Sequence, residues 1–92
     1  MIKSFRHKGL KLLFESGDHR GVPAHMVSRI IRRLDAIDAA AVATDLDLPG
    51  FELHRLKGDR KGTWSLRISA NYRITFTFRD GDAFDLHLED YH

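Results

Sequence analysis

The sequence predicts an α+β domain in which two N-terminal helices pack on one face of a small, mainly antiparallel sheet. In the first half of the chain apolar residues recur at helical spacing, and from Phe51 onward the period changes to two. The segments between the predicted strands are too short for crossover helices, so neighbouring strands must run antiparallel. With 92 residues, the chain is long enough for one core, and a single domain over residues 1–92 is expected.

The first helix is expected over residues 6 to about 15. Ser4 is a candidate N-cap, because its hydroxyl can accept a hydrogen bond from a free backbone N–H of the first turn. Gly17 is a typical C-terminal stop. Gly9, inside the helix, is expected to cost about 1 kcal/mol relative to alanine.

The second helix is expected over residues 23 to about 41. Pro23 suits its first turn, where the missing N–H would have no helical partner. One face carries apolar residues at helical spacing, namely Val27, Ile30, Ile31, Leu34, Ile37 and Ala41. Arg29, Arg32 and Arg33 are expected largely on the other side. Because charge opposite an apolar stripe is typical of any amphipathic helix, we favour a solvated face over a nucleic-acid patch.

Four strands are expected in the second half, over residues 51–56, 63–69, 72–79 and 83–88. Alternation places Trp64, Leu66 and Ile68 on one face of the second strand and Arg67 on the other. The third strand alternates in the same way. Residues 80–82, Asp-Gly-Asp, predict a tight hairpin, since both residue types tolerate positive φ. The sheet is therefore expected to have an apolar face for the helices and a polar face carrying arginine.

The composition excludes several classes of protein. Hydrophobic residues make up 42% and charged residues 30% of the chain, which is typical of a globular domain. The absence of cysteine excludes disulfides and thiolate sites. No apolar run is long enough to span a membrane and residues 1–8 lack a signal-peptide segment, so a cytoplasmic location is expected. The net charge is only +2, but cations gather in the second half, which favours a polyanionic partner over an ordinary solvated surface.

The end of the chain combines a strand with chemically active groups. Residues 84–88 alternate as a strand, and Asp90, Tyr91 and His92 then supply a carboxylate, a phenol and an imidazole. Strand phase places His54, Arg67, Arg73 and His87 on the polar face. The alternative for each residue is structural: a satisfied strand histidine, a salt-bridge arginine, an amphipathic chain end. A metal site from His87, Glu89, Asp90 and His92 is disfavoured, because the intervening Leu88 puts potential ligands on alternating faces.

These groups fit the cleavage of RNA without a metal. That reaction needs a base for the 2′-hydroxyl proton, cations for the phosphate and an acid for the leaving oxygen. Proton transfer is available from His54, Asp90, Tyr91 and His92, and positive charge from Lys57 and Arg73. The ring of Tyr91 is also able to stack on a base.

Four separated blocks resemble one known family. They are IKSFRHKGL at residues 2–10, LHRLKGDR at 53–60, WS at 64–65 with NYRITF at 71–76, and EDYH at 89–92. In this order they resemble the HigB toxins of the RelE/ParE superfamily, and the resemblance spans the whole chain. It implies a bacterial type II toxin that cuts translated mRNA in the 30S decoding site of the 70S ribosome, without a metal or cofactor. It also implies inhibition by a helix-turn-helix antitoxin of the HigA type.

The resemblance implies roles for individual residues as well. The catalytic set would be His54, Lys57, Asp90, Tyr91 and His92. Arg73 would bind the scissile phosphate and Asn71 would help to read the codon, while Arg60, Lys61 and Arg67 would face ribosomal RNA. Two alternatives stay open: a non-enzymatic inhibitor of DNA gyrase like the ParE branch, which has no use for proton-transfer groups, and an RNA-binding module without catalysis.

Overall fold

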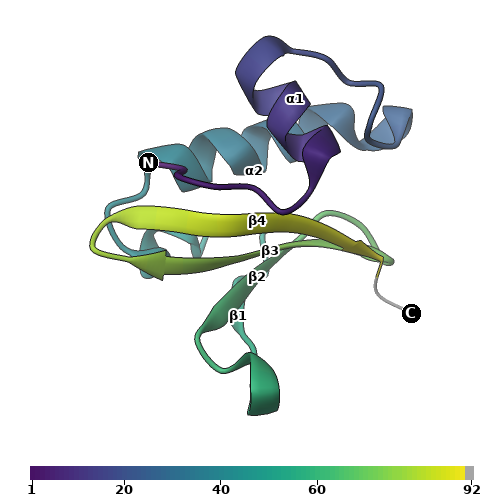
Figure 1. Cartoon of the computed structure of the whole chain (residues 1–92). Helices are drawn as coiled ribbons and strands as arrows, with labels where there is room; N and C mark the ends of the chain where they lie inside the picture. Colours follow the sequence, from purple (N-terminus) through teal and green to yellow (C-terminus); the bar gives the residue numbers. More distant parts are fainter. Residues whose placement is uncertain (91–92) are drawn as a thin grey trace.

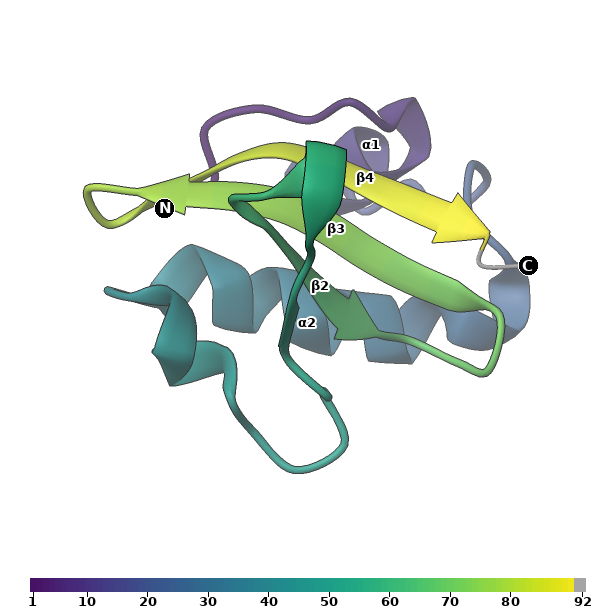
Figure 2. The same ribbon diagram turned by 90° about the horizontal axis from the view of Figure 1, so that it is seen from below.

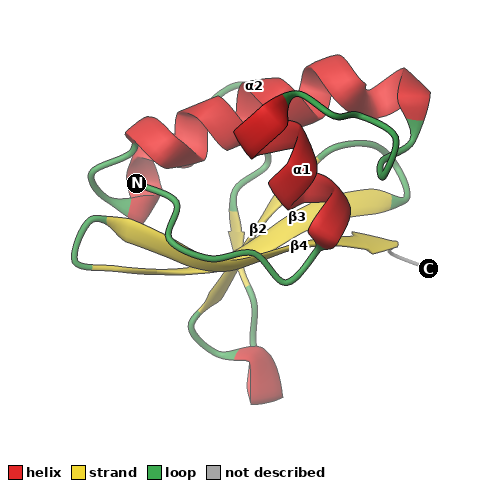
Figure 3. Cartoon of the chain, turned by 45° about the horizontal axis from the view of Figure 1, so that its top comes forward, coloured by secondary structure: helices red, strands yellow, loops and turns green. Residues whose placement is uncertain are grey.

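The computed structural model describes residues 1–90 and has two layers, helices above and a sheet below (Figure 1). The elements, in chain order, are α1 (Lys8–Ser16), the 3-10 turn η1 (Ala24–Met26), α2 (Val27–Ala39), η2 (Ala43–Leu46), β1 (His54–Arg55), η3 (Gly58–Arg60), β2 (Thr63–Arg67), β3 (Tyr72–Arg79) and β4 (Asp82–Asp90). The strands are antiparallel in the order β1-β2-β3-β4. Both helices cover the same face (Figure 3). The predicted fold class is confirmed.

The caps of α1 differ from the prediction at one end. His7 is the N-cap, and its Nδ1 accepts a hydrogen bond of 3.1 Å from the N–H of Leu10. The expectation for Ser4 was wrong, because its hydroxyl accepts a hydrogen bond from the backbone N–H of Asp85 instead. At the other end Gly17 adopts φ 73° and its N–H bonds to the carbonyl of Leu13, as predicted.

Gly9 has a steric role that a helix-propensity argument does not show. A Cβ atom at this position would lie 2.3 Å from the carbonyl oxygen of Gly21, in the loop between the helices. The reciprocal contact is also too close for a side chain, since a Cβ on Gly21 would lie 2.7 Å from the Cα of Gly9. Glycine at residue 9 therefore allows two backbones to touch, so treating it as a mild penalty was wrong.

Arg33 of α2 lies on the buried side of the helix, so the expectation of a solvated arginine was wrong for this residue. It is 7% exposed, and its guanidinium donates to the carbonyls of Arg67 and Gly50 at 2.8 and 3.2 Å. The group also stacks 4.5 Å from the ring centroid of Phe51. Burial lowers the pKa of Arg33, and the nearby positive charge of Arg32 adds to the effect. The side chain binds α2 to the loop that precedes β1.

The register of the sheet confirms the predicted faces. Leu66, Ile74 and Leu88 are neighbours across β2, β3 and β4, and all three are buried against the helices. β1 is shorter than the expected 51–56, because Phe51 enters the core and Glu52 adopts φ 47°. β2 ends at residue 67 rather than 69, and β4 extends to residue 90 rather than 88.

The N-terminal segment lies along the outer edge of β4. Parallel bridges join Ile2 to Ala83 and Phe5 to Leu86. The predicted hairpin between β3 and β4 is confirmed, with Asp80 at φ 51° and the following glycine at φ 82°. No helix within residues 1–90 is long and apolar enough to cross a membrane.

Candidate active site

Figure 2 views the sheet from the side that the helices leave open. A row of four polar residues crosses this face. Register pairs His54 with Ser65, Ser65 with Thr75, and Thr75 with His87, so the row takes one residue from each strand. Side chains paired in this way lie on the same face of a sheet. The next row on this face holds Arg67, Arg73 and Glu89. The predicted placement of His54, Arg67, Arg73 and His87 on the polar face is confirmed.

His54 and Arg73 line the same hollow, which has a volume of about 270 Å³. The other residues around it are Glu52, Leu53 and Leu56. Arg73 donates a hydrogen bond of 3.1 Å from Nη1 to the hydroxyl of Ser65, which is fully buried. The structure therefore brings together an imidazole and a guanidinium whose orientation is fixed by a buried hydroxyl.

A hydrogen-bonded cluster connects the basic turn η3 to β4. Arg60 makes two hydrogen bonds to the carboxylate of Glu89, one of 2.9 Å from Nη1 and a shorter one from Nη2. Thr75 donates a third, of 2.6 Å, to the same carboxylate. The hydrogen bonds from Arg60, and then that from Thr75, hold the pKa of Glu89 below its usual value. Glu89 is thus a charged anchor for the protruding turn.

The other predicted residues of the described chain do not line the hollow of His54 and Arg73. Lys57 and Lys61 are exposed on either side of η3, which projects from the open face (Figure 1). Arg67 is paired with Glu52 at 2.8 Å. Asn71 is exposed in the turn before β3, where its backbone N–H donates to the hydroxyl of Ser69.

Asp90 ends β4 opposite Tyr72, next to the row that contains Arg73. Its register position is out of phase with Glu89, so it does not belong to the two polar rows. The predictions for Tyr91 and His92 lie outside the described residues. Within residues 1–90, no group of three histidine, aspartate or glutamate side chains is placed to hold a metal ion.

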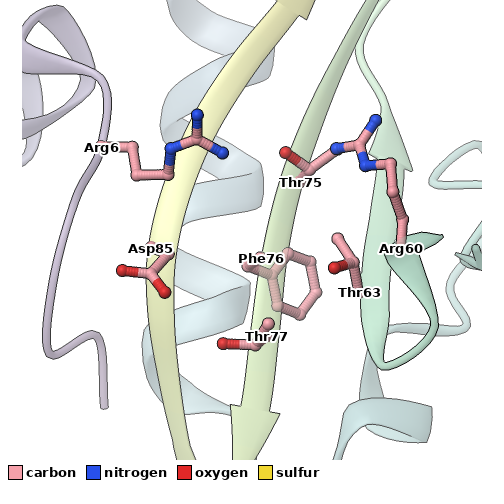
Figure 4. A pocket seen from close by; sticks show the side chains of 7 residues that line it. All are labelled: Arg6, Arg60, Thr63, Thr75, Phe76, Thr77 and Asp85. Atoms are coloured by element: carbon pink, nitrogen blue, oxygen red, sulfur yellow. The ribbon is translucent and has the colours of Figure 1, made fainter.

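A second hollow lies on the same face, over the middle of β3, with a volume of about 140 Å³ (Figure 4). Its lining combines Arg6 and Arg60 with Thr63, Thr75, Phe76, Thr77 and Asp85. Arg6 was not predicted as a site residue, because it precedes α1 and is not part of the strand alternation. Ser65 was not predicted as a site residue either, although the phase of the second predicted strand already placed it on the polar side.

Comparison with known proteins identifies the family. The family model described as the RelE-like toxin of type II toxin-antitoxin system HigB matches residues 3–92. The chain belongs to the HigB-like toxin family. The expected resemblance is therefore confirmed, and the protein is a toxin of a type II toxin-antitoxin system, which has an antitoxin as its partner.

Two curated HigB-like toxins are similar over nearly their whole length. Endoribonuclease HigB of Proteus vulgaris is 59% identical over 92 residues, covering 100% of both chains. Toxin HigB-1 of Vibrio cholerae serotype O1 is 33% identical over 91 residues, covering 97% of this chain and 96% of the relative.

Solved toxin structures share the fold. In the heterotetrameric YoeB-YefM toxin-antitoxin complex from Staphylococcus aureus, the matching chain is 21% identical, with a TM-score of 0.64, covering 100% of this chain and 95% of its own length. The YoeB/ParE toxin from Agrobacterium tumefaciens is 18% identical, with a TM-score of 0.59 and coverage of 99% and 96%. At these identities the likeness concerns the two-helix, antiparallel-sheet architecture alone.

Proposed function

We propose that this HigB-like toxin is an endoribonuclease that cleaves translated mRNA in the decoding site of the ribosome. The observation that carries the proposal is the hollow shared by His54 and Arg73 on the open face of the sheet. A histidine changes protonation near neutral pH and a guanidinium binds phosphate oxygens in a bidentate manner. Such a pair provides proton transfer and charge stabilisation at one phosphodiester. The 59% identity with an endoribonuclease over the full length supports the same reaction.

In this reaction the 2′-oxygen attacks the adjacent phosphorus while the bond to the 5′-oxygen breaks. One group accepts the 2′-hydroxyl proton and another donates a proton to the departing 5′-oxygen. We assign these steps to the set His54, Lys57, Asp90, Tyr91 and His92, with Arg73 on the scissile phosphate. Ionisable groups that interact closely titrate jointly, so the set is treated as a unit and the base and acid are not assigned individually. No metal or cofactor takes part in this scheme.

A chain with a net charge of only +2 has little overall attraction for free RNA, so the ribosome is proposed to position the toxin on its substrate. Arg60, Lys61 and Arg67 are proposed to face ribosomal RNA, and Asn71 to help to read the codon. Arg60 and Lys61 belong to the projecting segment around η3, and all four residues are exposed. Exposed cations bind the phosphate backbone without sequence preference, which suits docking on a structured RNA. We expect weak cleavage of free RNA. The antitoxin is proposed to be a helix-turn-helix protein of the HigA type.

The test is cleavage of a translated mRNA in a bacterial extract, with cut sites mapped by primer extension. His54→Ala and His92→Ala are expected to abolish the cuts that the unaltered toxin makes. His25→Ala is the matched control, because His25 is exposed in η1, on the helix side of the chain. Full cleavage by both active-site variants would overturn the residue assignment. Growth arrest with intact mRNA and inhibited gyrase supercoiling would overturn the proposed activity itself.

A further inference from the structure

The hollow over β3 is rich in hydrogen-bond donors that have no partner in the described part of the chain. The backbone of Arg6 is fixed, since its N–H donates to the carbonyl of Leu86 at 2.8 Å. Its guanidinium reaches over β4 toward β3 (Figure 4) and makes no hydrogen bond or ion pair within residues 1–90. The hydroxyls of Thr63 and Thr77, which are register partners, also make none there. The hollow therefore offers a guanidinium with five N–H donors, carried on a fixed backbone, beside two hydroxyl groups.

Both carboxylates near this hollow already accept hydrogen bonds from the protein. The carboxylate of Glu89 takes hydrogen bonds from Arg60 and from Thr75, the third threonine of the lining. The carboxylate of Asp85 accepts from the hydroxyl of Ser4 at 3.4 Å and is turned toward the N-terminal segment (Figure 4). Arg60 pairs with Glu89, and Asp85, the other carboxylate of the lining, is turned toward Ser4, so Arg6 is the cation of this lining that is left for a ligand. A ligand that completes these bonds must present acceptor oxygens and a negative charge.

The position of the hollow indicates which anion this is. Arg73, Thr75 and Thr77 are successive outward-facing residues of β3, so each step between them is about 7 Å. The hollow, which Thr75 and Thr77 line, therefore lies one to two such steps along β3 from Arg73, the residue proposed to hold the scissile phosphate. On the basis of the proposed function, we infer that the hollow is a second phosphate subsite, which binds a phosphodiester of RNA beside the one that is cleaved. Arg6 is its principal ligand, and Thr63 and Thr77 are donors to the phosphate oxygens.

The phosphodiester could belong to the mRNA or to ribosomal RNA, and two binding measurements separate these sources. In the first, the toxin binds ribosomes programmed with an mRNA that carries 2′-O-methyl groups at the cleavage site. In the second, it binds ribosomes without mRNA. Arg6→Gln removes the charge and keeps polar atoms in place, and we expect about tenfold weaker binding. The slope of log affinity against log salt concentration should also become shallower, by about the amount that one phosphate contact contributes.

Arg20→Gln is the matched control, because it makes the same charge change in the loop between α1 and α2. Thr77→Val is a second variant that removes only a hydroxyl, and a smaller loss of affinity is expected. If binding becomes weaker only on ribosomes programmed with mRNA, the phosphate belongs to the mRNA. If binding becomes equally weaker on ribosomes with and without mRNA, the phosphate belongs to ribosomal RNA. If Arg6→Gln and Thr77→Val both bind the two kinds of ribosome with unchanged affinity and unchanged salt dependence, the proposed subsite is overturned.

The failure of this inference differs from the failure of the proposed function. If only the subsite is wrong, the unaltered toxin cleaves translated mRNA and Arg6→Gln cleaves and binds equally well. If the proposed function is wrong, the unaltered toxin itself leaves mRNA intact. Melting temperatures of all variants identify any loss of folding, which is not expected, because Arg6 is exposed.

Discussion

The hydroxyl of Ser65 accepts a hydrogen bond of 3.1 Å from the guanidinium of Arg73. Ser65 is 0% exposed and is the register partner of His54, so one buried side chain orients the proposed phosphate-binding group beside the proposed proton-transfer group. A side chain locked by packing in this way is a precise support for a neighbour, because its own rotamer is fixed.

Ser65→Ala is expected to lower the rate of mRNA cleavage about 10- to 100-fold while leaving KM nearly unchanged. A hydrogen bond to a charged group contributes about 1.5–3 kcal/mol, and about 1.4 kcal/mol corresponds to a factor of ten in rate. Ser65→Thr, which keeps the hydroxyl, should restore most of the rate. Ser28→Ala, on the exposed side of α2, is the control. A wild-type rate for Ser65→Ala would mean that Arg73 needs no such support.

Arg33→Met is expected to lower the free energy of unfolding by about 2–4 kcal/mol, because it removes the donor of two partly buried hydrogen bonds together with the packing of a buried guanidinium. The carbonyls concerned are those of Gly50 and Arg67. Urea denaturation measures the change. Arg32→Met alters the neighbouring exposed residue and should shift stability by less than about 0.5 kcal/mol. Equal effects of the two substitutions would contradict the role described for Arg33.

Gly9→Ala should destabilise the protein by about 1–3 kcal/mol, although alanine is the better helix former. The new methyl group would overlap the carbonyl oxygen of Gly21, and relief requires the loop between the helices to move. Thermal unfolding followed by circular dichroism measures the effect. Lys11→Ala, at an exposed position of the same helix, is the control and should leave the melting temperature nearly unchanged. An unchanged melting temperature for Gly9→Ala would show that the loop yields freely.

His7 is expected to make stability depend on pH. Burial, and then the neighbouring His87, lower the pKa of His7 below its usual value. The unfolded chain therefore binds this proton more readily, so the stabilising contribution is present above pH about 6.5 and is lost as the pH falls below it. Protonation also removes the Nδ1 acceptor that caps α1.

His7→Asn should flatten this part of the pH profile, because an asparagine N-cap accepts the same hydrogen bond without titrating. The measurement is the urea midpoint between pH 5 and pH 8. His19→Asn, in the exposed loop after α1, controls for the general loss of an imidazole. If both variants keep the slope of the unaltered protein, the pH dependence has another origin.

The regular parts of the fold were predictable from the sequence because local patterns determine them. The alternation of β3 gave its bounds and both faces correctly, and Gly17 marked the end of α1. Long-range contacts were not predictable in this way. His7 replaces Ser4 as N-cap because β4 engages the hydroxyl of Ser4 through Asp85. Arg33 is buried because carbonyls far away in the sequence satisfy its guanidinium.

The open face of the site was predictable to a similar degree. Strand phase alone placed His54 and Arg73 on one side of the sheet. It could not show that Ser65 would bond to Arg73, nor that a further guanidinium of this face would come from Arg6, before the first helix. That arrangement depends on the N-terminal segment lying against β4, a pairing of residues about 80 positions apart.

Because of this pairing, the N-terminal segment cannot take its final position before β4 has been synthesised. The hydrogen bonds from Lys3 to Ala83 and between Arg6 and Leu86 cannot form until β4 has left the exit tunnel of the ribosome. Contacts of such sequence separation form late and slowly compared with local ones. Without β4, the N-terminal segment has no strand edge against which Arg6 can be placed. The open face of the toxin is therefore completed only after β4 has joined the sheet.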